Sequence, residues 1–172
     1  GGADRFCPKG SAQPLFVRTG WFTNEDAHEL VRSSEAPCPA GFWCTGGERF
    51  PCPPGTWGKG GAAAASQAES CAACDAGFFC PHEAHTDPRP FRCGNASVFC
   101  PTGSARPTAA VAVGFYTTHA SGLYEGALAL ADPRNETMSA QLLCEPGFWC
   151  RGGVKYQCPA GTFGWAHGDG DP

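Results

Sequence analysis

Hydrophobic residues in this chain of 172 residues form short clusters separated by glycine, proline and cysteine. Two clusters, at 16–23 and 111–118, are rich in β-branched and aromatic residues and are bounded by glycine, which predicts short strands. A Thr-Asn-Glu-Asp sequence ends the first cluster and permits one helical turn over 26–31. We favour a hairpin with at most one helical turn, because the equivalent later spacer contains Gly122 and Gly126, which are poor helix formers.

A cysteine-centred phrase is repeated along the chain. It begins as Cys-Pro-Ala-Gly-Phe-Trp-Cys at 38–44 and ends as Cys-Pro-Pro-Gly-Thr-Trp-Gly at 52–58. A second copy at 144–164 preserves every cysteine interval, and a looser third copy begins at 74–80. Each proline-x-glycine after a cysteine predicts a tight turn, since glycine supplies the positive φ that other residues resist. The alanine-rich run at 60–68 follows two glycines and is predicted to be a loop.

A second repeat relates 1–11 to 94–104 at a constant offset, so that Cys7 matches Cys100. Self-similarity of this kind indicates tandem modules that pack mainly on their neighbours. We therefore predict small disulfide-rich modules with short β-hairpins and little helix, arranged as an elongated tandem-repeat rod. The predicted segments are a partial repeat with a spacer hairpin at 1–37, modules at 38–73 and 74–100, a spacer hairpin at 101–143 and an incomplete module at 144–172.

Composition supports disulfide-stabilised modules. The chain has 24 Gly and 16 Pro, 40 of 172 residues, yet 42% of its residues are hydrophobic, which is too apolar for a disordered chain. Twelve cysteines in such short phrases indicate a disulfide framework and hence an oxidising compartment, extracellular or at the cell surface. The absence of a signal peptide and of an initial methionine leads us to expect a mature or internal fragment of a secreted precursor.

Charge and hydropathy disfavour two classes of partner. The net charge is −4 and the 12 basic residues are scattered, so we expect no nucleic-acid binding. The longest uncharged apolar stretch, at 108–117, is far shorter than the roughly 20 residues that span a bilayer, so we expect no membrane span.

No motif indicates catalysis or a cofactor. Cys71 and Cys74 could bind zinc together with Cys80, His82 or His85, but a second Cys-x-x-Cys at structural-zinc spacing is absent. A redox role is equally weak, because no βαβ pattern surrounds this pair. His28, His119 and His167 lie in no nucleophile or metal motif, so we expect neither an enzyme nor a metal site.

The repeats restrict the disulfide pairing to two schemes. In the first, alternate cysteines of each quartet pair: Cys38 with Cys52, Cys44 with Cys71, Cys74 with Cys93, Cys80 with Cys100 and Cys144 with Cys158, leaving Cys7 and Cys150. In the second, Cys38 pairs with Cys44, Cys52 with Cys71, Cys74 with Cys93, Cys80 with Cys100 and Cys144 with Cys150, leaving Cys7 and Cys158.

Two sequons are candidate N-glycosylation sites, at Asn95 and Asn135, and we expect both to carry glycan on an outward face. Proline-rich turns are candidates for O-glycosylation, at Pro51, Pro53, Pro54, Pro88, Pro90 and Pro107.

The phrases at 38–44 and 52–58 resemble the cysteine-rich repeats of ephrin-receptor-like and tumour-necrosis-factor-receptor-like ectodomains. Algae and other protists use such repeats in long arrays on surface glycoproteins, including flagellar-hair (mastigoneme) proteins. The resemblance covers nearly the whole chain, and it implies elongated, disulfide-laddered rods with short hairpins and no active site.

Two functions follow as hypotheses. The first is a structural subunit or repeating segment of an extracellular glycoprotein fibre that associates head-to-tail, with Cys7 approaching Cys150 of a neighbouring copy. The second is a ligand- or carbohydrate-binding receptor ectodomain that uses its tryptophans as stacking surfaces. These are Trp21, Trp43, Trp57, Trp149 and Trp165. A protease inhibitor is a weaker alternative, since no feature marks a reactive loop.

Overall fold

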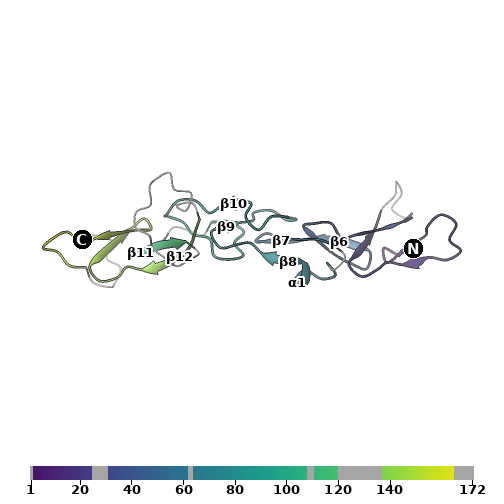
Figure 1. The fold of residues 1–172 in the computed structure, drawn as a ribbon, viewed down its shortest axis with the longest axis horizontal. Helices are drawn as coiled ribbons and strands as arrows, with labels where there is room; N and C mark the ends of the chain where they lie inside the picture. The colour runs from purple at the N-terminus through teal and green to yellow at the C-terminus, as the bar shows by residue number, and fades with distance from the viewer. Residues whose placement is uncertain (1, 25–30, 62–63, 108–110, 120–136, 165–172) are drawn as a thin grey trace. The chain divides into compact units, whose positions relative to one another are not determined.

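The structure is a computed structural model that describes residues 2–24, 31–61, 64–107, 111–119 and 137–164. In these residues the fold consists of short antiparallel hairpins joined by tight turns, with one four-residue helix, α1, Gln67–Ser70 (Figure 1). The predicted fold class, small disulfide-rich modules with short β-hairpins and little helix, is confirmed. The rod stays a prediction.

The chain divides into two compact units. Unit 1 is Gly1–Ala73 with His82–Pro88, and unit 2 is Cys74–Pro81 with Arg89–Pro172. The hairpins of unit 1 pair β1, Arg5–Phe6, with β2, Leu15–Phe16; β3, Trp21–Thr23, with β4, Glu35–Pro37; β5, Phe42–Thr45, with β6, Glu48–Pro51; and β7, Thr56–Gly58, with β8, Cys71–Ala73. Those of unit 2 pair β9, Phe78–Phe79, with β10, Phe91–Arg92; β11, Phe115–His119, with β12, Met138–Leu143; and β13, Phe148–Arg151, with β14, Val154–Gln157.

Glycine turns interrupt both predicted strands. The cluster at 16–23 is divided between β2 and β3, because the Trp21 amide donates to the Arg18 carbonyl across a turn in which Gly20 has a φ of 75°. In the cluster at 111–118, an equivalent turn at Gly114 delays the strand to Phe115. Each strand nevertheless begins one of the hairpins expected in the spacers, β3–β4 and β11–β12. The division of the sequence into five segments stays a prediction.

Local helix predictions had mixed outcomes. The predicted loop at 60–68 overlaps the start of α1, whose Ser66 hydroxyl accepts a hydrogen bond from the Glu69 amide as an N-cap. The sequence prediction missed this short helix, because two glycines precede the alanine run. The helical turn considered at 26–31 lies largely outside the described residues.

The same tertiary contact appears once in each unit. In unit 1 the buried Thr23 hydroxyl donates to the Ala3 carbonyl over 2.9 Å and lies 3.2 Å from the Gly47 carbonyl. In unit 2 the buried Thr117 hydroxyl donates to the Ala96 carbonyl over 2.8 Å and lies 3.2 Å from that of Gly153. We call each arrangement a threonine bridge. Each one ties a β-hairpin to a segment distant in the sequence, so the repeat is tertiary as well as sequential.

Disulfide sulfurs, rather than large side chains, fill most of the interior. Nine of the described cysteines are at most 4% exposed, whereas large apolar residues such as Phe16 and Val113 are exposed. Each unit has its own hydrophobic cluster, around Cys38 and Cys44 in unit 1 and around Tyr116, Cys144 and Cys150 in unit 2. Covalent closure is thus a main source of stability in modules with so little apolar core.

Candidate functional site

Five disulfides are formed. They join Cys38 to Cys44, Cys52 to Cys71, Cys74 to Cys80, Cys93 to Cys100 and Cys144 to Cys150, with Cα separations from 5.5 to 6.4 Å. The alternate-cysteine scheme is wrong in every pair. The second scheme is correct for three bonds and wrong for Cys74–Cys93 and Cys80–Cys100.

A turn with a glycine at the third position after the first cysteine explains the short disulfide that recurs in each phrase. The Phe42 amide donates to the Pro39 carbonyl over 3.2 Å, and Gly41 has a φ of 84°. This turn returns the chain so that Cys44 lies beside Cys38. The same amide-to-carbonyl bond follows Cys74 and Cys144, so Cys80 and Cys150 each pair with the first cysteine of their own phrase.

Glycine contacts explain the second disulfide. In the looser copy, the Cys93 amide donates to the Gly77 carbonyl and the Gly77 amide donates to the Cys100 carbonyl, which places the two cysteines side by side. In unit 1, Cys52 and Gly58 make the same two bonds with Gly41, so a glycine stands where Cys100 stands in the other copy.

Because Gly58 has no side chain, Cys52 forms its bond with a different residue. A Cβ at Gly58 would lie 2.9 Å from Cys52 Sγ. Cys71, the partner of Gly58 in the β7–β8 ladder, supplies the second sulfur. The pairing therefore depends on which residue the fold places beside each cysteine.

Cys7 and Cys158 are unpaired among the described residues, Cys7 exposed and Cys158 half-buried. Cys150, which the alternate-cysteine scheme left unpaired together with Cys7, is instead completely buried and bonded to Cys144. The predicted contact between Cys7 and Cys150 of a neighbouring copy is therefore wrong, because the turn at Gly147 already provides Cys150 with a partner.

Cys158 has the surroundings of Cys52 without its partner. Its amide donates to the Gly147 carbonyl over 3.0 Å, and the Gly147 amide donates to that of Gly164 over 3.3 Å, as around Gly41 and Gly58. A Cβ at Gly164 would lie 3.1 Å from Cys158 Sγ. A strand equivalent to β8 is absent from the described part of unit 2. Cys158 thus lies in a site built for a disulfide.

Cys7 has the surroundings of Cys100. The Cys7 amide donates to the Arg32 carbonyl over 2.8 Å, and the Cys100 amide donates to the Met138 carbonyl over 2.9 Å. Both acceptors precede or begin the second strand of a spacer hairpin. Cys100 is bonded to Cys93, so Cys7 also occupies a position that carries a disulfide elsewhere in the chain.

A cation with aromatic neighbours occupies the same place in both units. In unit 2, Lys155 Nζ lies 4.5 Å from the ring centroid of Tyr116 and 4.8 Å from that of Phe148. Glu145 completes this cluster: it accepts from Lys155 Nζ over 2.8 Å and from the Tyr116 hydroxyl over 2.9 Å. We call Tyr116, Glu145 and Lys155 the unit 2 charge cluster.

The charge cluster shifts the pKa of each member. The hydrogen bond from Lys155 holds the pKa of Glu145 below its ordinary value, although partial burial opposes this shift. Burial raises the pKa of Tyr116, and its hydrogen bond to Glu145 raises it further. Burial is the largest single influence on Lys155 and disfavours its charged form, but the hydrogen bonds and charge interactions with Glu145 and Tyr116 together outweigh burial and raise the pKa of Lys155. All three shifts favour a carboxylate, an ammonium and a neutral phenol together.

Unit 1 holds the cation without the carboxylate. Arg49 replaces Lys155, and its guanidinium lies 5.3 Å from the ring centroid of Phe22 and 5.8 Å from that of Phe42. Pro39 occupies the place of Glu145 in the repeated phrase. Phe22 occupies the place of Tyr116 but lacks its hydroxyl. Among the described residues Arg49 is exposed and makes no hydrogen bond or ion pair. Its contacts there are the two aromatic rings.

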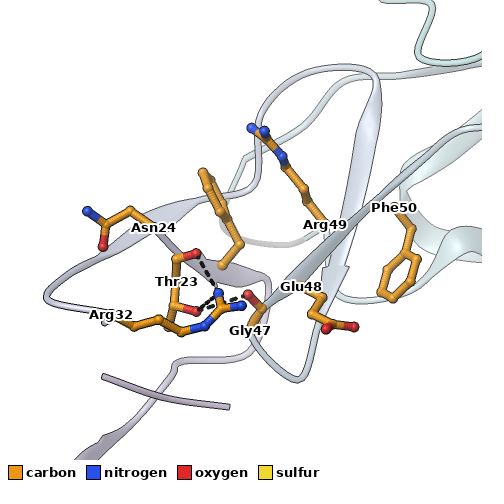
Figure 2. A pocket seen from close by; sticks show the side chains of 8 residues that line it. Thr23, Asn24, Arg32, Gly47, Glu48, Arg49 and Phe50 are labelled. Atoms are coloured by element: carbon orange, nitrogen blue, oxygen red, sulfur yellow. Dashed lines mark hydrogen bonds between the residues drawn. The ribbon is translucent and has the colours of Figure 1, made fainter. Parts of the chain in front are cut away.

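A cavity of about 540 Å³ lies beside this arginine. Phe22, Asn24, Arg32, Glu48 and Arg49 contribute to its lining (Figure 2). Arg32 points toward the threonine bridge, where its guanidinium donates to the Thr23 hydroxyl over 2.6 Å, whereas Arg49 extends away from these bonds (Figure 2). The sequence patterns did not predict this site. Aligning Arg49 with Lys155 and Pro39 with Glu145 in the repeated phrase is the signal that could have found it.

The described tryptophans are half-buried and contact their own hairpins. Trp43 stacks on Phe50 at a centroid distance of 4.6 Å, and Trp149 stacks on Tyr156 at 4.4 Å. The Arg18 guanidinium covers Trp21 at 3.5 Å, and Lys59 lies 5.4 Å from Trp57. Trp165 lies outside the described residues. Each described tryptophan ring is thus in contact with another side chain of the same chain on one of its faces.

The remaining candidate residues are in these places. Asn95 is exposed, and its side-chain oxygen accepts from the Ser97 amide over 3.0 Å, whereas Asn135 lies outside the described residues. Cys71, Cys74 and Cys80 are all in disulfides, so their sulfurs are not available as zinc ligands. The rings of His82 and His85 stack at 6.0 Å, and the described residues contain no cluster that could hold a metal ion. No described helix is long or apolar enough to cross a bilayer.

Neither a family model nor a curated protein matches this chain. The disulfides, the repeated contacts and the two cation sites are therefore the features of the molecule that bear on its function.

Proposed function

We propose that residues 1–172 are a repeating structural segment of an extracellular glycoprotein fibre, joined to neighbouring modules by disulfides from Cys7 and Cys158. The observation that carries this proposal is the environment of Cys158, which matches that of Cys52 in both glycine bonds but lacks the sulfur that Cys71 provides. A neighbouring module would supply the missing strand and its cysteine. Association through two different ends is heterologous and extends as a fibre unless it closes into a ring.

The repetition within the segment supports a structural role. Both units contain a threonine bridge, a stacked hairpin and a short disulfide at matching positions. Stacking of like modules on their neighbours is the organisation of repeat proteins, and it requires no active site. We accordingly propose a non-catalytic protein of the cysteine-rich repeat class described above.

An extracellular location and glycosylation belong to the same proposal. Disulfides form and persist in oxidising compartments, and five are formed here. Asn95 is exposed in a sequon, which leaves room for an N-linked glycan. The candidate O-glycosylation sites on proline-rich turns, and Asn135, extend this expectation along the chain.

Mapping of disulfide-linked peptides in non-reduced native material tests the joints. We expect the peptide that contains Cys7 to be linked to a cysteine of a neighbouring module. We expect the same of the peptide that contains Cys158. Free thiols at both positions would contradict the proposal, and so would a bond between Cys7 and Cys158 within one copy.

A matched set of variants tests the consequence for assembly. C158S is expected to shorten fibres seen by electron microscopy, because it removes a covalent joint while leaving all five internal disulfides. The control is S11A, which changes an exposed serine near Cys7. Fibres of unchanged length and reductant resistance in C158S would argue against a joint at this residue.

A further inference from the structure

We propose that the Arg49 site of unit 1 binds the carboxylate of a glutamate side chain presented by a protein partner. This inference does not depend on the fibre proposal, because it concerns a surface distant in the sequence from Cys158. It is based on the difference between two otherwise matching cation sites.

Unit 2 shows which chemistry the repeated scaffold places at this position. Phe22 and Tyr116 are equivalent, because each forms a parallel bridge to the second glycine of a Gly-Gly pair, Gly47 or Gly153. Arg49 and Lys155 are equivalent, because they are the ladder partners of Cys44 and Cys150. The carboxylate of Glu145 lies against the unit 2 cation. In unit 1 the corresponding residue is Pro39, which has no carboxylate.

The donors in unit 1 suit an incoming carboxylate. In unit 2 the two oxygens of Glu145 accept from two different groups, the Tyr116 hydroxyl and Lys155 Nζ. Phe22 has no hydroxyl, but an arginine offers two parallel N–H donors and can hold both carboxylate oxygens by itself. Replacement of Lys and Tyr by Arg and Phe therefore preserves two donors for one carboxylate.

The surroundings leave room for a ligand from outside. Arg49 is exposed and has no hydrogen bond among the described residues, whereas the Lys155 side chain is only 13% exposed. The cavity of about 540 Å³ beside Arg49 and Phe22 is larger than one glutamate side chain. Phe22 and Phe42 hold the guanidinium through cation–π contacts, which reduces the entropy it loses on binding.

A peptide is the favoured source of the carboxylate, because the group at the equivalent place in unit 2 is a glutamate that follows a cysteine and precedes Pro146 and Gly147. The probe is therefore the blocked tetrapeptide acetyl-Ser-Glu-Pro-Gly-amide, with its Gln counterpart as the uncharged control. Binding is followed by the NMR signal of the Arg49 side-chain Nε–H group. We expect a saturable shift with a dissociation constant on the order of millimolar, and at least about tenfold weaker binding of the Gln peptide.

Variants separate this site from general charge effects. R49Q is expected to abolish binding, while R106Q, which removes an exposed arginine from unit 2, is expected to bind as the wild type does. P39E places a carboxylate within the chain and is expected to weaken peptide binding about tenfold relative to P39Q, because it competes for the same donors.

Four outcomes would overturn the proposal. The first is equal binding of the Glu and Gln peptides, and the second is unchanged binding in R49Q. The third is an Arg49 signal that already has the shift of an ion-paired guanidinium before any peptide is added, since a carboxylate of the chain itself would then hold the site. Saturable binding of galacturonate in the absence of peptide binding would assign the site to an acidic sugar and overturn the peptide assignment.

Discussion

Units 1 and 2 share one scaffold but differ in how they neutralise a cation beside an aromatic cluster. In unit 2, Lys155, Glu145 and Tyr116 form a charge cluster that is complete within the chain. In unit 1, Arg49 lies on Phe22 and Phe42 and has no acidic partner among the described residues. The scaffold is therefore maintained by backbone contacts that both units keep, while the surface chemistry of each copy can change.

The shared part is the threonine bridge and the glycine under it. Gly47 and Gly153 both have a φ of 82°, and a side chain on either would overlap a carbonyl oxygen, that of Ala3 or Ala96. The units differ at three pairs of equivalent residues, which are Phe22 and Tyr116, Pro39 and Glu145, and Arg49 and Lys155. The following experiments test first what the units share and then what separates them.

The largest effect is expected from G47A and G153A. A methyl group at either position requires both a strained positive φ and movement of a backbone carbonyl, so each variant should lose at least about 3 kcal/mol of unfolding free energy. Thermal unfolding followed by the ring signals of Phe22 and Tyr116 would report the two units separately.

The neighbouring Gly46 and Gly152 provide matched controls. They also have positive φ, but nothing lies within 4 Å of an added Cβ, so G46A and G152A should lose only about 1 kcal/mol. Equal losses of unfolding free energy in G46A and G47A would show that glycine is needed at Gly47 for its positive φ and not for its close contact with the Ala3 carbonyl.

T23V and T117V should be less severe and unequal. Valine has a similar volume but removes the hydroxyl that donates to the half-buried Ala3 or Ala96 carbonyl, and leaving such a group unsatisfied typically costs about 1–3 kcal/mol. Thr23 also accepts from the Arg32 guanidinium, so T23V should lie near the upper end of that range and T117V near the lower end. Chemical denaturation of both variants checks the order, and a larger loss in T117V would be the contrary result.

E145Q should remove a pH dependence that belongs to unit 2. Because the folded-state pKa of Glu145 is lowered from 4.5, its stabilisation is present above that value and is lost as the pH falls through the folded-state pKa. The raised pKa values of Tyr116 and Lys155 act at the other end, where stabilisation is lost as the pH rises through them. The cluster is thus complete between the ordinary pKa of a glutamate and that of a tyrosine.

The side chain of Glu145 is 49% exposed, so solvent screening limits the effect to about 0.5 kcal/mol. Unfolding of unit 2 measured between pH 2 and 7 should lose this acid-dependent component in E145Q. E48Q changes an exposed glutamate of unit 1 and serves as the control. An identical dependence of stability on acid pH in wild type and E145Q would show that the charge cluster does not contribute to the stability of unit 2.

The smallest effect is expected when the unit 2 arrangement is transferred to unit 1. P39E should be more stable than P39Q by roughly 0.3–0.5 kcal/mol, since its carboxylate can pair with Arg49. The glutamine variant accounts for the loss of the proline ring, which by itself changes the unfolded chain. The backbone accepts the change, because the same turn is formed with Glu145 in unit 2. Equal stability of P39E and P39Q would mean that the two cation sites differ in more than the missing carboxylate.

The sequence by itself determined the local features. The proline-x-glycine turns, the spacer hairpins and the disulfide-rich class follow from residue types whose preferences act over a few positions. The repeated cysteine phrases also predicted three of the five disulfides, in the second of the two schemes. The sequence could not place the strand starts correctly, because Gly20 and Gly114 form turns inside clusters that have strand composition.

The tertiary structure decided the contacts between distant segments. Cys93 bonds to Cys100, a pair that neither scheme predicted, because Cys100 lies beside the turn glycine Gly77 at the place that Gly58 occupies beside Gly41 in unit 1. Such a pairing depends on which atoms three-dimensional folding brings within bonding distance, and cysteine spacing does not contain that information. The partner of each cation is decided in the same way, since Glu145 and Lys155 meet only after the hairpin has folded back on its phrase.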